Sequence, residues 1–560
     1  MQEPHDDAWA DLGPIGELPE GTPVLRKADG QRFVCVRRGE VVHALDDRCP
    51  HQGYPLSQGT VEGGVLTCEW HNWKFDLASG VCLFGGEPVR CYPTRIVDGR
   101  VRLDRRIDHA REAERLSAGI CAALVDDEPA RALREGLRLG QHRAGAPELG
   151  PLAAAFEVLA KDAATRAEYG FDHALAMLAD LLTWVERGWL PAAEAFVVAA
   201  TAVGEASKRL GRRTTAPPVV VAPQRAALVE FAASGLYDYG HGAIFVAKAE
   251  ELARRFPAAA EEVMASVAAS LGWATNETAL PPFTATREAL ASLMGQDGAK
   301  RNSARDGAGE ATRSSTKEDA AAGESAGLSE DAYVAALLAG EKEALAATLT
   351  ALARGVPATV LLRLAGRAAA IRTARFDNGW ETRTDTEVGV LDVTHAVTFV
   401  EAALSLSAEA PAAIGGRLAV IAAGFIGKLR RGDAAENVYS DMSSETCSVE
   451  AVVAAVEARD VALARRRGRG LSERERARVY PALAPFLAFD MAVRPIFVAH
   501  GVKMGEALYR LERGDPAGGG VYLDALLAYA TPRRSERRVR RIAQVAQKFM
   551  ADGRPPEGLY

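Results

Sequence analysis

Residues 49–57 read CPHQGYPLS, and residues 68–80 read CEWHNWKFDLASG. Each segment pairs one cysteine with one histidine, as Cys-x-His at Cys49 and His51 and as Cys-x-x-His at Cys68 and His71. The glycine, proline and asparagine around these pairs are typical of tight loops. Two facing loops of this kind would bring two thiol groups and two imidazole rings around one metal centre.

A Rieske-type [2Fe–2S] cluster needs two thiolates on one iron and two imidazoles on the other. The sequence therefore predicts that Cys49, His51, Cys68 and His71 hold such a cluster. A Cys₂His₂ zinc site is the alternative, because spacing alone does not name the metal. Zinc fingers, however, use Cys-x-x-Cys and His-x₃₋₅-His pairs rather than two mixed pairs, which favours the iron–sulfur cluster.

Residues 9–104 resemble the Rieske family as a whole. The resemblance extends from the two ligand pairs to the loop residues 53–56 and to a Trp-x-Phe-Asp-x-x-x-Gly run at residues 73–80. We expect the bulky side chains of Trp70, Trp73 and Phe75 to exclude water from the cluster. The resemblance implies one-electron transfer.

The resemblance also indicates the soluble ferredoxin and oxygenase branch of the family. The high-potential branch joins its two loops by a disulfide, where this chain has Tyr54 and Trp70. That branch also uses a Ser and a Tyr as hydrogen-bond donors to the cluster, where this chain has Asn72, Trp73 and Phe75. Fewer donors stabilise the reduced cluster less. We predict a reduction potential of about −150 mV, and a redox titration that placed it above about +100 mV would contradict this assignment.

Length and composition limit the remaining possibilities. A chain of 560 residues is expected to form two or three domains. The net charge of −7 argues against nucleic-acid binding and against binding to an anionic membrane. We see no apolar run that approaches about 18 residues and no secretory signal, so we expect a cytoplasmic protein. Of the seven cysteines, the five outside the two ligand pairs are scattered, which agrees with a reducing compartment.

The change in composition and periodicity along the sequence predicts a multidomain fold, with a small antiparallel β domain followed by a large all-α domain. Residues 1–105 form the predicted Rieske domain, in which Gly39 and Asp98-Gly99 mark tight turns between strands. Residues 106–295 and 330–560 show helical periodicity and form two halves of the α-helical domain. Residues 296–329 have almost no large apolar side chain, so we expect a flexible low-complexity insertion there.

Four histidines of the helical part begin the same short phrase: HALAM at His173, HGAIF at His241, HAVTF at His395 and HGVKM at His500. On a helix, residues i and i+4 share a face, so each histidine has a phenylalanine or methionine one turn further on. The hypothesis is that four helices bring these histidines into one pocket, which binds a metal or acts on a substrate.

Two aspartates extend this hypothesis. Asp238 precedes His241 by three residues, and Asp392 precedes His395 by three. Carboxylate–imidazole pairs at i,i+3 resemble the Glu-x-x-His device of helical di-iron proteins. The alternative is that these are ordinary helix-surface pairs, and that each histidine is a hydrogen-bonded core residue.

The helical body is similar to the questin oxidase-like family in the phrases HAVTFVEAAL at His395 and HGVKMGEALYRL at His500. A fungal member of that family performs an NADPH-dependent Baeyer–Villiger oxidation of a polyketide. The similarity implies redox chemistry on an organic substrate, with the Rieske domain as electron donor. The chain lacks the Asp-x-x-His-x₃₋₄-His run that binds iron in ring-hydroxylating oxygenases.

The sequence thus predicts an oxidoreductase in which a low-potential Rieske cluster supplies electrons to a helical domain that oxidises a small organic substrate. No Gly-x-Gly-x-x-Gly motif follows a strand, so NAD(P)H is expected to act only through a partner reductase or ferredoxin. The alternative is an electron carrier whose helical body is a non-catalytic platform for protein docking. Histidines gathered around a cavity favour the enzyme, and histidines dispersed over outer helix faces favour the platform.

Overall fold

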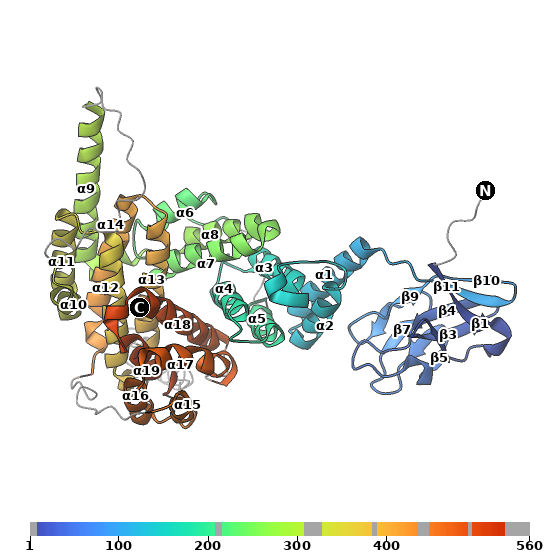
Figure 1. Ribbon diagram of the computed structural model, residues 1–560. Coiled ribbons are helices and arrows are strands. Elements are labelled where there is room, and N and C mark those ends of the chain that lie inside the picture. Colours follow the sequence, from blue (N-terminus) through green and yellow to red (C-terminus); the bar gives the residue numbers. More distant parts are fainter. Residues whose placement is uncertain are drawn as a thin grey trace, which may run out of the picture. The chain divides into compact units, whose positions relative to one another are not determined.

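The computed structural model describes residues 8–207, 215–306, 328–382, 389–434, 447–490 and 495–532. The chain divides into two compact units, Met1–Gly145 and Ala146–Tyr560. As Figure 1 shows, the labelled strands all belong to the first unit, and the second unit is built from helices. The predicted order, a small antiparallel β domain followed by a mostly helical body, is confirmed.

The first unit contains three small antiparallel sheets. The first sheet has the order β1-β11-β10, the second β2-β3-β4-β9 and the third β5-β6-β7-β8. The strands are β1 (Trp9–Pro14), β2 (Val24–Ala28), β3 (Gln31–Arg38), β4 (Val41–Asp46), β5 (Thr60–Glu62), β6 (Val65–Thr67), β7 (Lys74–Asp76), β8 (Cys82–Phe84), β9 (Cys91–Tyr92), β10 (Thr94–Val97) and β11 (Arg100–Asp104).

The predicted tight turns join neighbouring strands. Gly39, with φ of 62°, connects β3 to β4, and Asp98 and Gly99, both with positive φ, connect β10 to β11. Alternate residues of β3 enter two different cores, because side chains on a strand point to opposite faces. Phe33 and Cys35 pack in one core, and Val34 and Val36 pack in the other, beneath the two ligand loops.

Two helices follow the last strand and belong to the same compact unit: α1 (His109–Val125) and α2 (Pro129–Leu139). They pack against each other as a hairpin. A side chain at Gly119 of α1 would place its Cβ 2.7 Å from the carboxylate of Glu135 in α2, so glycine permits this close crossing. The strands end at Asp104, next to the expected domain boundary, but the compact unit continues to residue 145.

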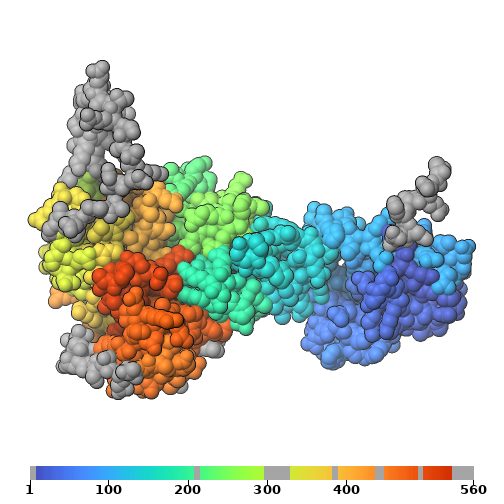
Figure 2. Space-filling model, viewed as in Figure 1, coloured from blue at the N-terminus to red at the C-terminus, as the bar shows by residue number. Residues whose placement is uncertain are grey.

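The second unit consists of helices joined by loops and short 3₁₀ turns. Its helices are α3 (Ala153–Arg166), α4 (His173–Glu186), α5 (Ala192–Ser207), α6 (Arg225–Ala232), α7 (His241–Arg255), α8 (Ala260–Trp273), α9 (Thr284–Asp306), α10 (Glu330–Ala339), α11 (Glu341–Ala353), α12 (Ala358–Arg375), α13 (Val390–Ala408), α14 (Ala412–Lys428), α15 (Val449–Glu457), α16 (Val461–Arg469), α17 (Glu473–Pro485), α18 (Pro495–Gly514) and α19 (Val521–Ala530). Figure 2 shows the C-terminal helices, in red, against the helices near residue 200, in green.

Four helices form a central ring in this unit: α4 packs on α7, α7 on α13, α13 on α18, and α18 on α4. The four predicted histidines lie at one position along the axes of these helices. Ion pairs such as Lys248–Asp180 and Arg510–Glu401 lie at a second position along the same axes. On every helix the ion-pair residue follows the histidine in sequence, so all four helices run in the same direction. Parallel neighbours need long connections, which the other helices supply.

Within the described residues, two helical segments are long and apolar enough to cross a membrane, Val390–Ala408 and Ala412–Gly432, contrary to the expectation that no such run exists. Their windows are 72% and 83% buried inside the structure, which is the pattern of core helices. The apolar character of α13 thus reflects its place in the central ring.

The predicted insertion at residues 296–329 is described only at its two ends. Helix α9 continues through the first part of it to Asp306, and Ser329 caps α10. Residues 307–327 lie outside the described residues.

Candidate functional site

The two predicted ligand loops have the same backbone design. In the first loop the backbone N–H of Cys49 donates to Tyr54 O over 2.8 Å, and that of Gly53 donates to Cys49 O over 2.8 Å. In the second, Cys68 N–H donates to Trp73 O over 2.8 Å and Asn72 N–H to Cys68 O over 3.0 Å. The fourth residue after each cysteine has a left-handed backbone, with φ of 80° at Gly53 and 57° at Asn72. Glycine and asparagine are the residues that tolerate this conformation best.

The four predicted ligands converge between these loops. The side chains of Cys49 and Cys68 are 3% and 1% exposed, and the imidazole rings of His51 and His71 lie 4.6 Å apart between centroids. His51 Nδ1 is buried without a hydrogen-bond partner, as expected of an atom that binds iron. Burial, and then the neighbouring Cys68, raise the pKa of Cys49 to about 12, so iron binding must displace the thiol proton. This donor set fits a Rieske cluster.

Aromatic side chains surround the ligands. The indole of Trp73 stacks on the ring of His51 at 4.8 Å, and Phe75 is fully buried beneath the loops. Trp70 stacks on His71 at 5.1 Å and is itself 55% exposed, so it covers one face of that ring from the solvent side. Trp73 and Phe75 shield the inner side of the site, and the His71 side faces solvent.

The two loops are joined by an aromatic contact, since the rings of Tyr54 and Trp70 lie 5.5 Å apart. None of the seven cysteines forms a disulfide. Tyr54 and Trp70 stand at the two positions that a disulfide joins in the high-potential branch. Their aromatic contact in its place agrees with the low-potential branch.

A second group of ligand atoms lies in the central helical ring. His173, His241, His395 and His500 each direct a ring nitrogen into one cluster, in which these atoms all lie within 4.8 Å of one another. His173 and His241 are the first residues of α4 and α7, whereas His395 and His500 each lie one and a half turns into their helices. We call these four residues the histidine cluster.

Distances inside the histidine cluster match those between metal ligands. The Nε2 atoms of His173 and His241 are 3.0 Å apart, and those of His395 and His500 are 3.1 Å apart. Imidazole nitrogens bind metals at about 2.1 Å, so two ligands at a right angle lie about 3.0 Å apart and two tetrahedral ligands about 3.4 Å apart. The same separations are those of Nε2–Nε2 hydrogen bonds between neutral imidazoles, so they fit both a metal site and the hydrogen-bonded core histidines of the alternative.

Backbone carbonyls orient two of these rings. His500 Nδ1 lies 2.7 Å from the carbonyl oxygen of Ile496, and the ring of His241 bonds to the backbone of Asp238. A ring that donates from Nδ1 to a carbonyl keeps its Nε2 lone pair available, as in many metal sites.

The surroundings keep all four rings neutral. Burial, and then the charge of Lys503, lower the pKa of His241 to about 3, and burial likewise lowers the pKa of His173, His395 and His500. Neutral imidazole is the form that binds a metal. His395 and His500 are 7% and 1% exposed, whereas His173 and His241 are partly exposed, so the cluster is most accessible at the beginning of α4 and α7.

The two predicted aspartates do not belong to the histidine cluster. The Asp238 carboxylate accepts a hydrogen bond from the backbone N–H of Thr275 over 2.9 Å, and that of Asp392 accepts from Gly389 N–H over 3.3 Å at the start of α13. Both carboxylates thus satisfy backbone donors. The group of candidate ligand atoms found in the described residues contains the four histidines and neither carboxylate, so the role of Asp238 and Asp392 as metal ligands or acid–base groups stays a prediction.

Burial next to Asp238 makes Glu277 sensitive to pH. Glu277 is 4% exposed, and burial raises its pKa from 4.5 to about 7. The unfolded chain releases this proton at lower pH, so the folded state loses stability as pH rises from about 4.5 to about 7. We expect Glu277→Gln to stabilise the protein by about 1–2 kcal/mol at pH 8 and by almost nothing at pH 4. Urea unfolding at both pH values measures this, and exposed Glu62→Gln is the control. A gain that is equal at the two pH values would contradict the assignment.

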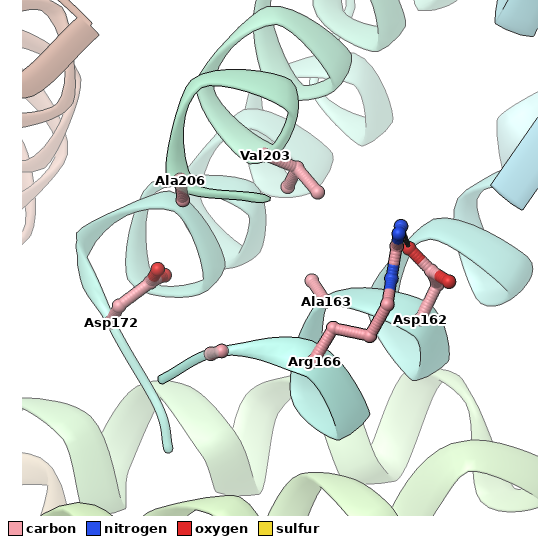
Figure 3. A pocket seen from close by; sticks show the side chains of 7 residues that line it. Asp162, Ala163, Arg166, Asp172, Val203 and Ala206 are labelled. Carbon is pink, nitrogen blue, oxygen red and sulfur yellow. Dashed lines mark hydrogen bonds and ion pairs between the residues drawn. The ribbon is translucent and has the colours of Figure 1, made fainter. Parts of the chain in front are cut away.

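A small pocket lies beside the start of α4 (Figure 3). Residues from α3 and α5 line it together with Asp172, which precedes His173, and the Asp162–Arg166 ion pair lies on the side opposite Asp172. Its cavity volume is about 10 Å³. A cavity of about 10–15 Å³ holds a single water molecule, so this pocket has room for at most one water and none for an organic substrate.

Sequence reasoning missed a layer of buried charges beside the histidine cluster. Lys248 Nζ lies 2.8 Å from Asp180, 3.3 Å from Glu251 and 3.3 Å from Glu401, and these side chains come from three helices of the ring. Lys503 is also buried, its Nζ has no hydrogen-bond partner, and burial lowers its pKa to about 7. Asp180 and Lys248 each follow a cluster histidine by seven residues, which is a signal that the sequence contains.

Comparison with known proteins addresses the first unit. A family model described as "Rieske [2Fe-2S] domain" matches residues 8–93. The anthranilate 1,2-dioxygenase ferredoxin subunit of Burkholderia cepacia is 39% identical over 98 residues, which are 17% of this chain and 91% of that protein.

Other matches cover a smaller part of a larger protein, or are structural. The chloroplastic pheophorbide a oxygenase of Oryza sativa subsp. japonica is 55% identical over 80 residues, 14% of this chain and 15% of that protein. Among solved structures, the ferredoxin of carbazole 1,9a-dioxygenase from Nocardioides aromaticivorans IC177 is 23% identical, with a TM-score of 0.17. The match covers 18% of this chain and all of that ferredoxin. The matched residues thus span nearly the whole of a ferredoxin but only a small part of an oxygenase.

Proposed function

This chain belongs, through residues 8–93, to the Rieske [2Fe–2S] domain family, and from that premise we propose a redox function for its helical unit as well. The chain is a Rieske oxidoreductase whose cluster, when bound, transfers one electron at a time. We propose that the histidine cluster binds iron and that this second site oxidises an organic substrate with electrons from the Rieske cluster.

The convergence of four neutral imidazoles is the observation that carries this proposal. Imidazole ligands suit iron, copper, nickel and zinc. Zinc has no redox chemistry, so an electron-transfer domain in the same chain favours a metal that changes oxidation state. Iron is the proposal among these metals because the same chain already needs iron for its Rieske cluster.

The reaction class follows from the electron supply. Insertion of one oxygen atom into a C–H bond consumes dioxygen, two electrons and two protons, and forms one C–OH group and one water molecule. The Rieske cluster would supply the two electrons in two steps, and a separate NAD(P)H-dependent reductase or ferredoxin would reload it. Relatives named as dioxygenase ferredoxin and oxygenase components support this class. The similarity of the His395 and His500 phrases to questin oxidase-like proteins supports an organic substrate.

The protein's own residues would keep the second site dry and neutral. His395 and His500 lie inside the ring, flanked by the buried side chains of Phe399 and Met504 one turn further on. Substrate or oxidant would reach the metal from the partly exposed side of His173 and His241. A location in the cytoplasm stays a prediction.

The alternative is an electron carrier whose helical unit only docks other proteins. Histidines on outer helix faces were the expected sign of that function. The four histidines instead face one another inside the ring, and a docking surface has no use for buried ligand atoms. The interior position of the histidines thus supports the enzyme, whereas the cavity that was expected around them stays a prediction, since none of the four lines the pocket beside the start of α4.

Metal analysis tests the proposal. We would measure iron, other metals and acid-labile sulfide, with EPR, in anaerobically purified protein and in a Cys49→Ser/Cys68→Ser variant. We expect about three irons and two sulfides per chain, of which about one iron and no sulfide remain in the variant. Two irons that are both lost in the variant would overturn the second site, and zinc in place of the third iron would overturn its redox role.

A further inference from the structure

The α1–α2 hairpin reaches the first ligand loop of the Rieske cluster. It lies in the same compact unit as the cluster loops but beyond residues 8–93, which match the family model. Arg138 of α2 donates from Nη2 to the carbonyl oxygen of Pro50 over 3.2 Å. Pro50 stands between the ligands Cys49 and His51, so this hydrogen bond holds the backbone that carries both of them.

A buried carboxylate fixes Arg138 in place. Glu87 is fully buried, and its Oε1 lies 2.9 Å from Arg138 Nη1. Arg134, one turn earlier on the same helix face, donates from Nε to the two Glu87 oxygens over 3.1 and 3.0 Å. Two guanidinium groups thus share one carboxylate, which leaves this triad with a net charge of +1.

The triad lies at the cluster itself. Arg134, Arg138, Cys49 and His51 line the same open cleft within this unit. Reduction adds one negative charge to the cluster, so a nearby positive charge stabilises the reduced state and raises the potential. Arg134 and Arg138 are 30% and 33% exposed, so solvent screens part of this effect.

We propose that the α1–α2 hairpin is an accessory part of the electron-transfer site, in which Arg138 and Arg134, anchored on Glu87, position the first cluster loop and raise the cluster's reduction potential. The rest of the ligand environment keeps the reduction potential at the low end of the Rieske range. The hairpin raises the potential within that low part of the range. Arg134, Arg138 and Glu87 are positioning residues, since none of them ligates the cluster.

Charge-changing substitutions in the full-length protein test this inference by EPR-monitored redox titration with iron and sulfide analysis. Arg138→Gln and Arg134→Gln should each lower the midpoint potential, because the triad becomes neutral. Glu87→Gln should raise it, because the triad becomes +2. Arg138→Lys keeps the charge and should stay near the wild-type potential. Arg100→Gln, which breaks a similar pair with Asp11 in another sheet, is the matched control and should leave the potential unchanged.

The midpoint potential is expected to fall in the Arg→Gln variants and to rise in Glu87→Gln. General damage to the fold would instead shift the potential of all variants in the same direction, so the opposite signs separate this role from a merely structural one. Wild-type potentials in both Arg→Gln variants with full cluster content would overturn the inference. A shift of Glu87→Gln in the same direction as Arg138→Gln would also overturn it. If Arg138→Gln loses its cluster while Arg138→Lys keeps it, the positioning role is supported, and Arg134→Gln then decides the effect of charge.

Discussion

His395→Ala, made in the Cys49→Ser/Cys68→Ser background, is expected to lower the remaining iron from about one atom per chain to near zero. Even a change in the groups that support a metal ligand costs about 10–100-fold in metal affinity, and loss of a ligand costs more. His395 is 7% exposed and its Nε2 lies 3.1 Å from that of His500, so no solvent-exposed group can simply replace it. Iron analysis of desalted protein, with an iron titration of the apoprotein, measures the effect.

Two further variants make this result specific. His241→Ala removes a ligand from the opposite pair and should have the same effect, since His241 pairs with His173. His109→Ala changes a histidine outside the cluster and should leave the iron content unchanged. Iron that persists in both His395→Ala and His241→Ala would show that the histidine cluster is not the second metal site.

Lys248→Met is expected to destabilise the helical unit by about 3–5 kcal/mol, the usual cost of leaving buried charges without their partner. Lys248 is 3% exposed and faces Asp180, Glu251 and Glu401, so its loss leaves three carboxylates in the ring with less compensation. Arg510 still pairs with Glu251 and Glu401, whereas within the described part of the chain the Asp180 carboxylate accepts a hydrogen bond from Lys248 only. Urea unfolding followed by circular dichroism measures the change.

The dependence on pH identifies the cause of this destabilisation. Burial raises the pKa of Asp180 to about 7 even with Lys248 present, so without the lysine Asp180 takes up a proton more readily. The loss of stability should therefore be smaller at pH 5 than at pH 8. Lys161→Met removes an exposed partner of Glu262 and should cost less than about 1 kcal/mol. Equal losses for both lysine variants would contradict a special role for the buried charge.

The local sequence was sufficient to predict the Rieske site. Its four ligands lie in two short loops, each closed by its own backbone hydrogen bonds, so the spacing of Cys49, His51, Cys68 and His71 already contains most of the geometry. The turns at Gly39 and Asp98-Gly99 were predictable for the same reason, since a positive φ depends on the residue itself. The exposure of Trp70 was not predictable, because it depends on what covers the second loop.

The helical unit shows where local reasoning ends. The repeated phrase selected His173, His241, His395 and His500, but the same reasoning also selected Asp238 and Asp392, which cap backbone groups. The acidic and basic groups that do lie beside the cluster, such as Asp180 and Lys248, stand two turns further along their helices. Spacing within one helix tells which residues share a face, but not which face the neighbouring helices cover.

The sequence by itself therefore determined the β-then-α order and selected the candidate cluster ligands and the four candidate histidines, because these depend on short-range spacing and side-chain chemistry. Only the tertiary structure decided that α4, α7, α13 and α18 form one parallel ring, that Lys248 joins three of its helices, and that Arg138 reaches Pro50 across 88 residues of sequence. Parallel packing of helices far apart in the chain depends on the whole set of connecting helices, and no local pattern records that arrangement.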